Sequence, residues 1–183
     1  MTADFDDFDA IVYDCDGTLV RLAVDWEAAA REAAARLSEA GVDAGGMDLW
    51  AMLDLADETG HREELEDVLS AHECEGAADS ARLPLADRVS THDVPVGVCS
   101  LNAECAVREA LSRHGLAEYV DVVVGRDSVS TRKPDPEPLL ATLRALGVDP
   151  DRALFVGDSE RDAETAARAG VAFRYVGDGP SGH

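Results

Sequence analysis

The sequence predicts an α/β fold, a doubly wound parallel sheet with a small inserted helical cap. Short apolar runs alternate with amphipathic helical patterns, and each run ends in polar residues or glycine, as buried parallel strands do. The stretch between the first two runs is far longer than a crossover helix requires. Because 183 residues can hold one ordinary core plus an insertion, we expect a core of residues 1–19 and 83–183 and a cap of residues 20–82.

The core strands are predicted at the apolar runs, which cover residues 10–13, 94–99, 120–124, 153–156 and 172–176. Helical patterns lie between most of them, at residues 105–114, 137–146 and 162–169. Each helical pattern is followed by a glycine (Gly115, Gly147 or Gly170), the residue that most easily adopts the left-handed conformation that ends a helix. Strand, helix and strand therefore alternate along the core.

The cap is predicted to contain three helices. Asp25 can cap the N-terminus of the first, whose apolar residues follow one face: Trp26, Ala30, Ala33 and Leu37. A second helix over residues 47–59 ends at Gly60, and a third covers residues 61–72. The polar segment 73–80 predicts a loose connection back to the core.

The charge balance is strongly acidic. Asp and Glu number 38 against 16 Lys and Arg, which gives a net charge of -22 and makes nucleic acid an unsuitable partner. Fifteen of the sixteen basic residues are arginine, a composition that resembles cytoplasmic proteins of halophiles, where strong salt screens self-repulsion. An acidic mesophilic protein is the alternative, and it would be fully stable in dilute buffer.

Membrane insertion and secretion are not expected. No run of eighteen apolar residues is present, and the acidic residues 1–9 lack the features of a secretory signal. We therefore expect a cytoplasmic protein that makes no contact with membrane.

The four cysteines show neither the close spacing of a zinc or redox site nor the density of a disulfide scaffold. We expect all of them to be free thiols: Cys15, Cys74, Cys99 and Cys105. Period-two alternation directs Cys15 away from the aspartates on either side, which predicts a packing role.

The segment Asp14-Cys15-Asp16-Gly17-Thr18 follows the first predicted strand. Ligands of open α/β sheets bind beyond the carboxyl ends of the strands, so the Asp14 carboxylate would project into the crevice and could attack phosphorus. Asp16 falls on the same side, where it can act as general acid and base. Gly17 allows a tight turn and Thr18 can anchor it; a solvated turn without chemistry is the alternative.

Three further polar residues follow other strands. Ser100 and Asn102 come after the second strand, and their side chains and backbone N–H groups can hold phosphate oxygens. Lys133 is the single lysine of the chain, which suggests a task that needs a compact ammonium group, such as neutralising phosphate.

Asp158 ends the fourth strand and, with Asp14, would form a hard oxygen site suited to Mg²⁺, completed by a backbone carbonyl at Asp16. Such a metal reduces the repulsion between anions. Asp162, at the start of the next helix, could orient Lys133 or a metal-bound water.

These motifs, in this order, resemble those of the haloacid dehalogenase superfamily, and within it the phosphoglycolate-phosphatase-like members with a helical cap after the first motif. The resemblance implies that Asp14 is the nucleophile and Asp16 the general acid and base. It implies phosphate binding by Ser100, Asn102 and Lys133, and Mg²⁺ binding by Asp14, Asp16 and Asp158 with Asp162 in support.

The resemblance also implies a Mg²⁺-dependent phosphatase that acts on a small phosphorylated metabolite. Two alternatives stay open, a phosphosugar mutase with the same core residues and a non-catalytic phosphate-binding protein. The candidates for contact with the leaving group are cap residues, although surface or packing roles are expected for most of them: Arg21, Trp26, Arg31, Trp50, His61, Arg62 and His72.

Overall fold

The computed structural model describes residues 4–177, and the outermost ends of the predicted core, residues 1–3 and 178–183, lie outside this range. Within it, parallel strands form one five-stranded sheet in the order β5-β4-β1-β6-β7. The strands are β1 (Ala10–Tyr13), β4 (Val96–Cys99), β5 (Val122–Val124), β6 (Ala153–Gly157) and β7 (Ala172–Tyr175). The α/β fold class and all five predicted strands are confirmed.

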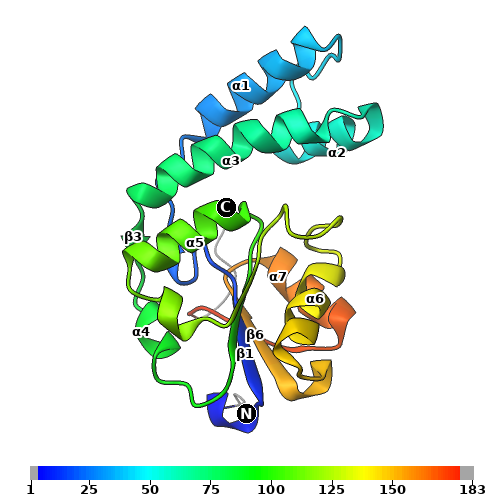
Figure 1. Cartoon of the computed structure of the whole chain (residues 1–183). Helices are drawn as coiled ribbons and strands as arrows, with labels where there is room; N and C mark the ends of the chain where they lie inside the picture. Colours follow the sequence, from blue (N-terminus) through cyan, green and yellow to red (C-terminus); the bar gives the residue numbers. More distant parts are fainter. Residues whose placement is uncertain (1–3, 178–183) are drawn as a thin grey trace.

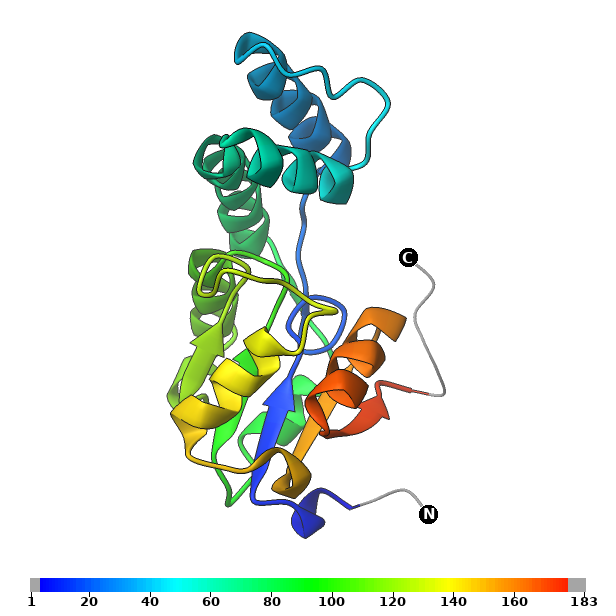
Figure 2. The ribbon, with the colours of Figure 1, turned by 90° about the vertical axis from the view of Figure 1, so that its right-hand side faces the viewer.

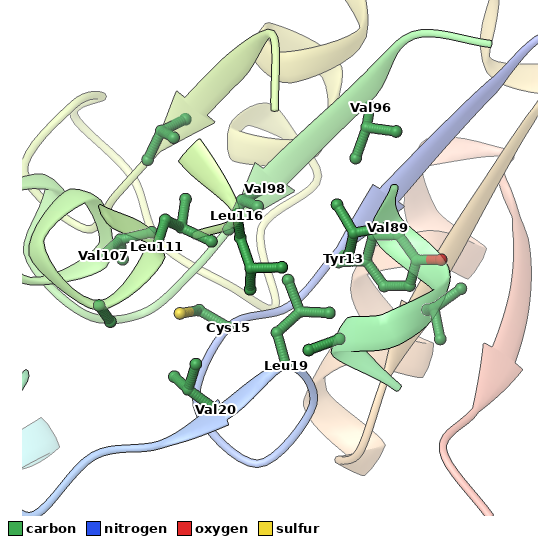
Figure 3. Packing of buried hydrophobic residues seen from close by; sticks show 14 of the residues in the cluster. Tyr13, Cys15, Leu19, Val20, Val89, Val96, Val98, Val107, Leu111 and Leu116 are labelled. Carbon is green, nitrogen blue, oxygen red and sulfur yellow. The ribbon is translucent and has the colours of Figure 1, made fainter. Parts of the chain in front are cut away.

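Helices cover both faces of the sheet (Figure 1). They are α4 (Ala86–Val89), α5 (Glu104–Arg113), α6 (Glu137–Leu146) and α7 (Glu160–Ala169). The alternation of β1 explains the two layers, because Ile11 and Tyr13 pack with the buried residues of α5, whereas Ala10 and Val12 pack with those of α6 and α7. Figure 3 shows the first of these cores, in which Cys15 is fully buried beside Leu19. The predicted packing role of Cys15 is confirmed.

Between β1 and β4 the chain forms a separate helical layer, which we call the helical insertion. Its helices are α1 (Trp26–Glu39), α2 (Leu49–Thr59) and α3 (Arg62–Ala78). The strands β2 (Val20–Arg21) and β3 (Ala81–Arg82) pair in antiparallel fashion where the chain enters and leaves the insertion. Figure 2 shows that the carboxyl end of β1 points toward these helices.

Local signals explain where the insertion helices begin and end. The side chains of Asp25 and Asp48 accept hydrogen bonds from backbone N–H groups in the first turns of α1 and α2, and Gly60 ends α2 with a positive φ of 79°. Apolar residues of all three helices form a core of their own, which includes Leu37, Leu53 and Leu69. Sequence reasoning did not predict the β2–β3 ribbon or α4.

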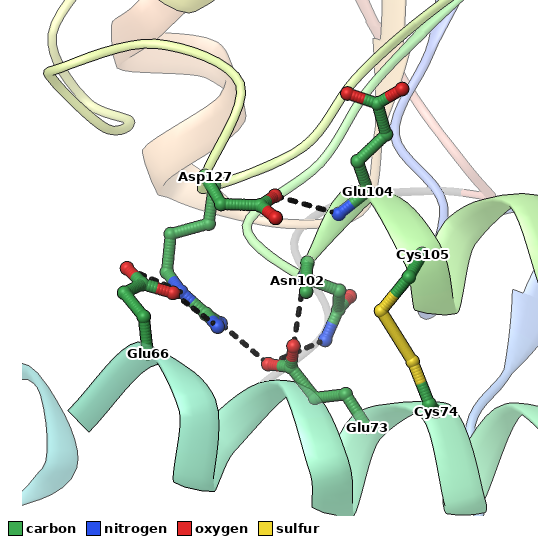
Figure 4. Close-up of a disulfide and its surroundings, with 9 residues drawn as sticks. Glu66, Glu73, Cys74, Asn102, Glu104, Cys105 and Asp127 are labelled. Atoms are coloured by element: carbon green, nitrogen blue, oxygen red, sulfur yellow. Dashed lines mark hydrogen bonds and ion pairs between the residues drawn. A yellow bond between two sulfur atoms is a disulfide. The ribbon is translucent and has the colours of Figure 1, made fainter. Parts of the chain in front are cut away.

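Two predictions about the insertion are wrong. Residues 73–80 are not a loose connection, because α3 continues to Ala78 and packs along α5. Cys74 on α3 and Cys105 on α5 form a disulfide rather than two free thiols (Figure 4). The cause of both errors is the same packing of α3 on α5, which places residues 31 positions apart in the chain next to each other. Cys15 and Cys99 are free and buried.

None of the helices described in residues 4–177 has the length and apolar character needed to span a membrane.

Candidate active site

The predicted site residues from three different loops meet around Lys133, beyond the carboxyl ends of β1, β4, β5 and β6. The Lys133 side chain is buried, and its Nζ donates hydrogen bonds to Oδ1 of Asp14 at 2.9 Å and to Oδ1 of Asp162 at 2.6 Å. It also donates to the backbone carbonyl of Cys99 at 3.1 Å. The one lysine of the chain thus joins the carboxyl ends of β1 and β4 to the first turn of α7.

Burial and charge shift the protonation of this group. Burial raises the pKa of Asp14 to about 8, Lys133 opposes the rise, and the nearby carboxylates of Asp162 and Asp158 add to it. Burial alone lowers the pKa of Lys133, but Asp14 and Asp162 outweigh it and hold the pKa well above its ordinary value. The Lys133 ammonium therefore stays charged. Its charge alone does not bring the pKa of Asp14 back to the ordinary range of a carboxylic acid.

The turn after β1 holds the two aspartates apart. The Thr18 hydroxyl donates to Oδ2 of Asp14 at 3.3 Å, whereas the Leu22 backbone N–H donates to Oδ1 of Asp16 at 2.9 Å. Gly17 has a φ of 88°, and a Cβ atom there would lie 2.3 Å from a carboxylate oxygen of Asp158. Only glycine fits this approach, which brings the β1 turn against the end of β6.

The predicted phosphate-binding residues lie in what we call the β4 loop, made of Ser100, Leu101 and Asn102. The Ser100 hydroxyl donates to the Asn102 side-chain oxygen at 3.2 Å and accepts from the Asn102 backbone N–H at 3.1 Å. Both side chains are buried. These two hydrogen bonds join the ends of the loop to each other.

Among the described residues, the carboxylates of Asp14, Asp158 and Asp162 have oxygens within 4.8 Å of one another and could hold a metal ion. Asp162 is already engaged, because its Oδ1 accepts from Lys133 and its Oδ2 accepts from the Ser159 hydroxyl at 2.7 Å. The Asp16 carboxylate is not part of this group. Clustered carboxylate oxygens are the donors that Mg²⁺ prefers, so the chemistry of the site fits the ion.

A cavity of about 810 Å³ lies over these groups. The predicted residues that line it are Asp14, Asp16, Asn102, Lys133, Asp158 and Asp162. Gly17, Thr18 and Ser100 do not line the cavity. They contact residues that do, namely Asp158, Asp14 and Asn102. Of the seven cap candidates, Trp26 and Trp50 are the ones that line this cavity within the described part of the chain.

Sequence reasoning did not single out several residues of the cavity wall, among them Arg161 and Glu73. Arg161 lies over the Trp50 ring, with its guanidinium carbon 4.7 Å from the ring centroid. Glu73 reaches the cavity from α3, inside the segment that was predicted to be loose. Glu73 gave no local signal, because it acquires its partners only when the insertion meets the core. Arg161 lies between the predicted residues Asp158 and Asp162, but its partner Trp50 comes from the insertion.

The carboxyl edge of the parallel sheet carries a candidate nucleophile, a buried lysine and an acidic cluster. This combination defines a hydrolase-type α/β site. The match to a family model carries this further, since residues 8–170 match the model described as haloacid dehalogenase-like hydrolase. The chain belongs to this family.

The chain is similar to proteins named phosphoglycolate phosphatase. One from Cereibacter sphaeroides is 36% identical over 92% of this chain and 85% of the relative, and one from Rhodospirillum rubrum is 35% identical over 88% and 76%. A solved structure of a haloacid dehalogenase-like hydrolase from Bacteroides fragilis covers 96% of this chain and 90% of its own, with a TM-score of 0.68 and 23% identity. That structure supports the fold.

Proposed function

We propose that the protein is a phosphatase that hydrolyses a small phosphorylated metabolite through an aspartyl-phosphate on Asp14. The observation that carries the proposal is the buried Lys133 between Asp14 and Asp162, under a cavity at the carboxyl edge of the sheet. The phosphatase names of the relatives that are 35–36% identical support the same activity.

The proposed reaction has two steps. An oxygen of Asp14 attacks phosphorus while the bond to the leaving oxygen breaks, and Asp16 gives its proton to that oxygen. Water then attacks the phosphorus of phospho-Asp14, Asp16 takes up the proton, and the bond between Asp14 and phosphorus breaks. Lys133 and the β4 loop would hold the phosphate oxygens throughout.

Mg²⁺ is the cofactor we propose, bound by Asp14 and Asp158 with a contribution from Asp16. When bound, the ion would neutralise charge on the phosphate and on the attacking carboxylate. The raised pKa of Asp14 supports this assignment, because burial and neighbouring carboxylates disfavour the ionised form that must attack. Asp162, already bonded to Lys133 and Ser159, would hold the lysine in place.

We propose that residues 20–82 act as a cap over a core of residues 1–19 and 83–183. Trp26 and Trp50 support this role, since they extend from the insertion to the cavity. Large aromatic rings can cover the apolar face of a leaving group, so a phosphorylated acid or sugar is the substrate class. A phosphosugar mutase would use the same residues and is the second candidate.

The acidity of the chain supports a protein adapted to strong salt. A cytoplasm that holds molar KCl is the compartment we propose on this ground. Activity and stability should then rise together as KCl increases, and a protein that is equally stable in dilute buffer would contradict the halophilic origin.

A phosphatase panel in molar KCl tests the function. Purified protein is assayed with p-nitrophenyl phosphate, phosphoglycolate and common sugar phosphates, with Mg²⁺ and then with EDTA. We expect Mg²⁺-dependent phosphate release by the wild type and none by Asp14→Asn. Conversion of one sugar phosphate into its isomer without phosphate release would favour the mutase, and silence from folded protein would overturn the proposal.

A further inference from the structure

One buried carboxylate outside the predicted motifs contacts the β4 loop. Glu73 lies on α3, and its side chain is 1% exposed. One carboxylate oxygen accepts from the Ala103 backbone N–H at 2.7 Å, and the other accepts from Nδ2 of Asn102 at 3.4 Å. Figure 4 shows Glu73 pointing from α3 toward Asn102. The helical insertion therefore bonds directly to the loop that is proposed to hold phosphate.

Arg126 fixes this carboxylate from the core. Its Nη1 donates to Oε1 of Glu73 at 2.6 Å and to the carbonyl of Leu101 at 3.0 Å, and its backbone N–H donates to the carbonyl of Asn102 at 2.9 Å. Arg126 is 2% exposed. One arginine thus binds both Glu73 and the backbone of the β4 loop.

The charges of this cluster are paired inside the protein: Arg126 contacts two glutamates, and one of them, Glu66, also lies 3.8 Å from a guanidinium nitrogen of Arg62. Arg126 also pairs with Glu66, about two turns before Glu73 on α3, through Nε at 2.9 Å and Nη2 at 2.8 Å. A buried charge is retained without large cost only when it is paired and hydrogen-bonded. Apolar residues alone could pack α3 on α5, so this packing does not require a charged cluster. The hydrogen bonds of the cluster to the β4 loop therefore point to a role in orienting that loop.

We propose that Glu73 is a positioning residue for phosphate binding, held by Arg126, and that it sets the orientation of the β4 loop from the helical insertion. The inference rests on the proposed function of this loop. Asn102 would present its amide to the phosphate only while Glu73 holds that amide and the following N–H. The insertion then contributes to phosphate affinity as well as covering the cavity.

Glu73→Gln tests the proposal with little change in size. The glutamine can accept one hydrogen bond from Ala103, but its amide group faces the guanidinium of Arg126, donor against donor. Because phosphate is held in both the ground state and the transition state, a displaced loop should raise KM and the inhibition constant of inorganic phosphate by about tenfold or more. The value of kcat should stay within about threefold.

Glu66→Gln is the matched control, because Glu66 pairs with the same arginine from the same helix without touching the β4 loop. A purely structural role would give both variants the same loss of stability and leave phosphate affinity unchanged. We expect a raised phosphate constant for Glu73→Gln alone. Equal constants for both variants and the wild type would overturn the proposal.

Calorimetric titration with inorganic phosphate and Mg²⁺ separates this test from the proposed function. It reports phosphate affinity even if the wild type hydrolyses nothing. An active wild type with a Glu73→Gln variant of unchanged phosphate affinity would overturn this proposal alone. If Glu73→Gln does not fold, the double variant Glu73→Gln/Arg126→Met removes the guanidinium donor that opposes the glutamine amide, and Glu66 keeps Arg62 as a partner at 3.8 Å. That variant should fold and bind phosphate more weakly, and wild-type affinity there would contradict the role of Glu73.

Discussion

Reducing the Cys74–Cys105 disulfide should lower the stability of the protein. The bond closes a loop with a sequence separation of 31 residues, and the chain-entropy relation gives a stabilisation of about 3.7 kcal/mol at 25 °C for that length. For a chain of 183 residues this corresponds to a fall in Tm of about 7–15 °C. The fall can be measured by thermal unfolding in molar KCl with and without a phosphine reductant.

The double variant Cys74→Ser/Cys105→Ser should unfold at the temperature of the reduced wild type and should not respond to the reductant. Thiol titration of the denatured, unreduced protein gives a second measure, for which we expect two reactive thiols, Cys15 and Cys99. Four reactive thiols, or equal Tm values with and without reductant, would refute the reasoning and restore the expectation drawn from cysteine spacing.

The remaining predictions concern the site itself. Asp16→Asn should slow hydrolysis of alkyl phosphates by about 100-fold or more. Hydrolysis of p-nitrophenyl phosphate should be affected much less, because nitrophenolate leaves without a proton. Equal losses in the steady-state rates for both substrates would exclude the role of Asp16 as general acid. Lys133→Met should cost about 3–5 kcal/mol of unfolding free energy in urea titrations, since two buried carboxylates lose their partner, and an unchanged midpoint would contradict this. Mg²⁺ at a hundred times its dissociation constant should stabilise the wild type by about 2.7 kcal/mol in thermal unfolding, and Asp158→Asn should respond less than the wild type.

The strands and core helices were predictable because local signals mark them. A parallel strand buried on both faces reads as a continuous apolar run, as in Ala10–Tyr13. The helix ends were equally clear, since Gly147 and Gly170 adopt the left-handed conformation that stops α6 and α7. The ends of the strands in turn fixed where the motif residues would lie, which is why Asp14 and Lys133 meet as their positions predicted.

The segment after residue 72 shows what local signals leave out. Glu73 and Gly76 made it read as a polar connection, because a charged residue and a helix-breaking glycine rarely lie inside a buried helix. In the structure, Glu73 is buried because Arg126, 53 residues away, neutralises it. A Cβ at Gly76 would lie 2.9 Å from the backbone of Ala23, and the Ala23 N–H donates to the Gly76 carbonyl at 3.0 Å.

The two residues that looked like breaks in the helix, together with Cys74 between them, thus join the insertion to the core. Glycine lets α3 approach the incoming chain, Cys74 links α3 to α5, and the glutamate meets the arginine beside the β4 loop. Each of these residues needs a partner from a distant part of the chain. The composition of the neighbouring sequence therefore cannot reveal its role. A helical stretch at the boundary of an insertion can therefore contain polar or small residues for a reason other than a break in the helix. Such residues can be the contacts that hold the insertion over the site.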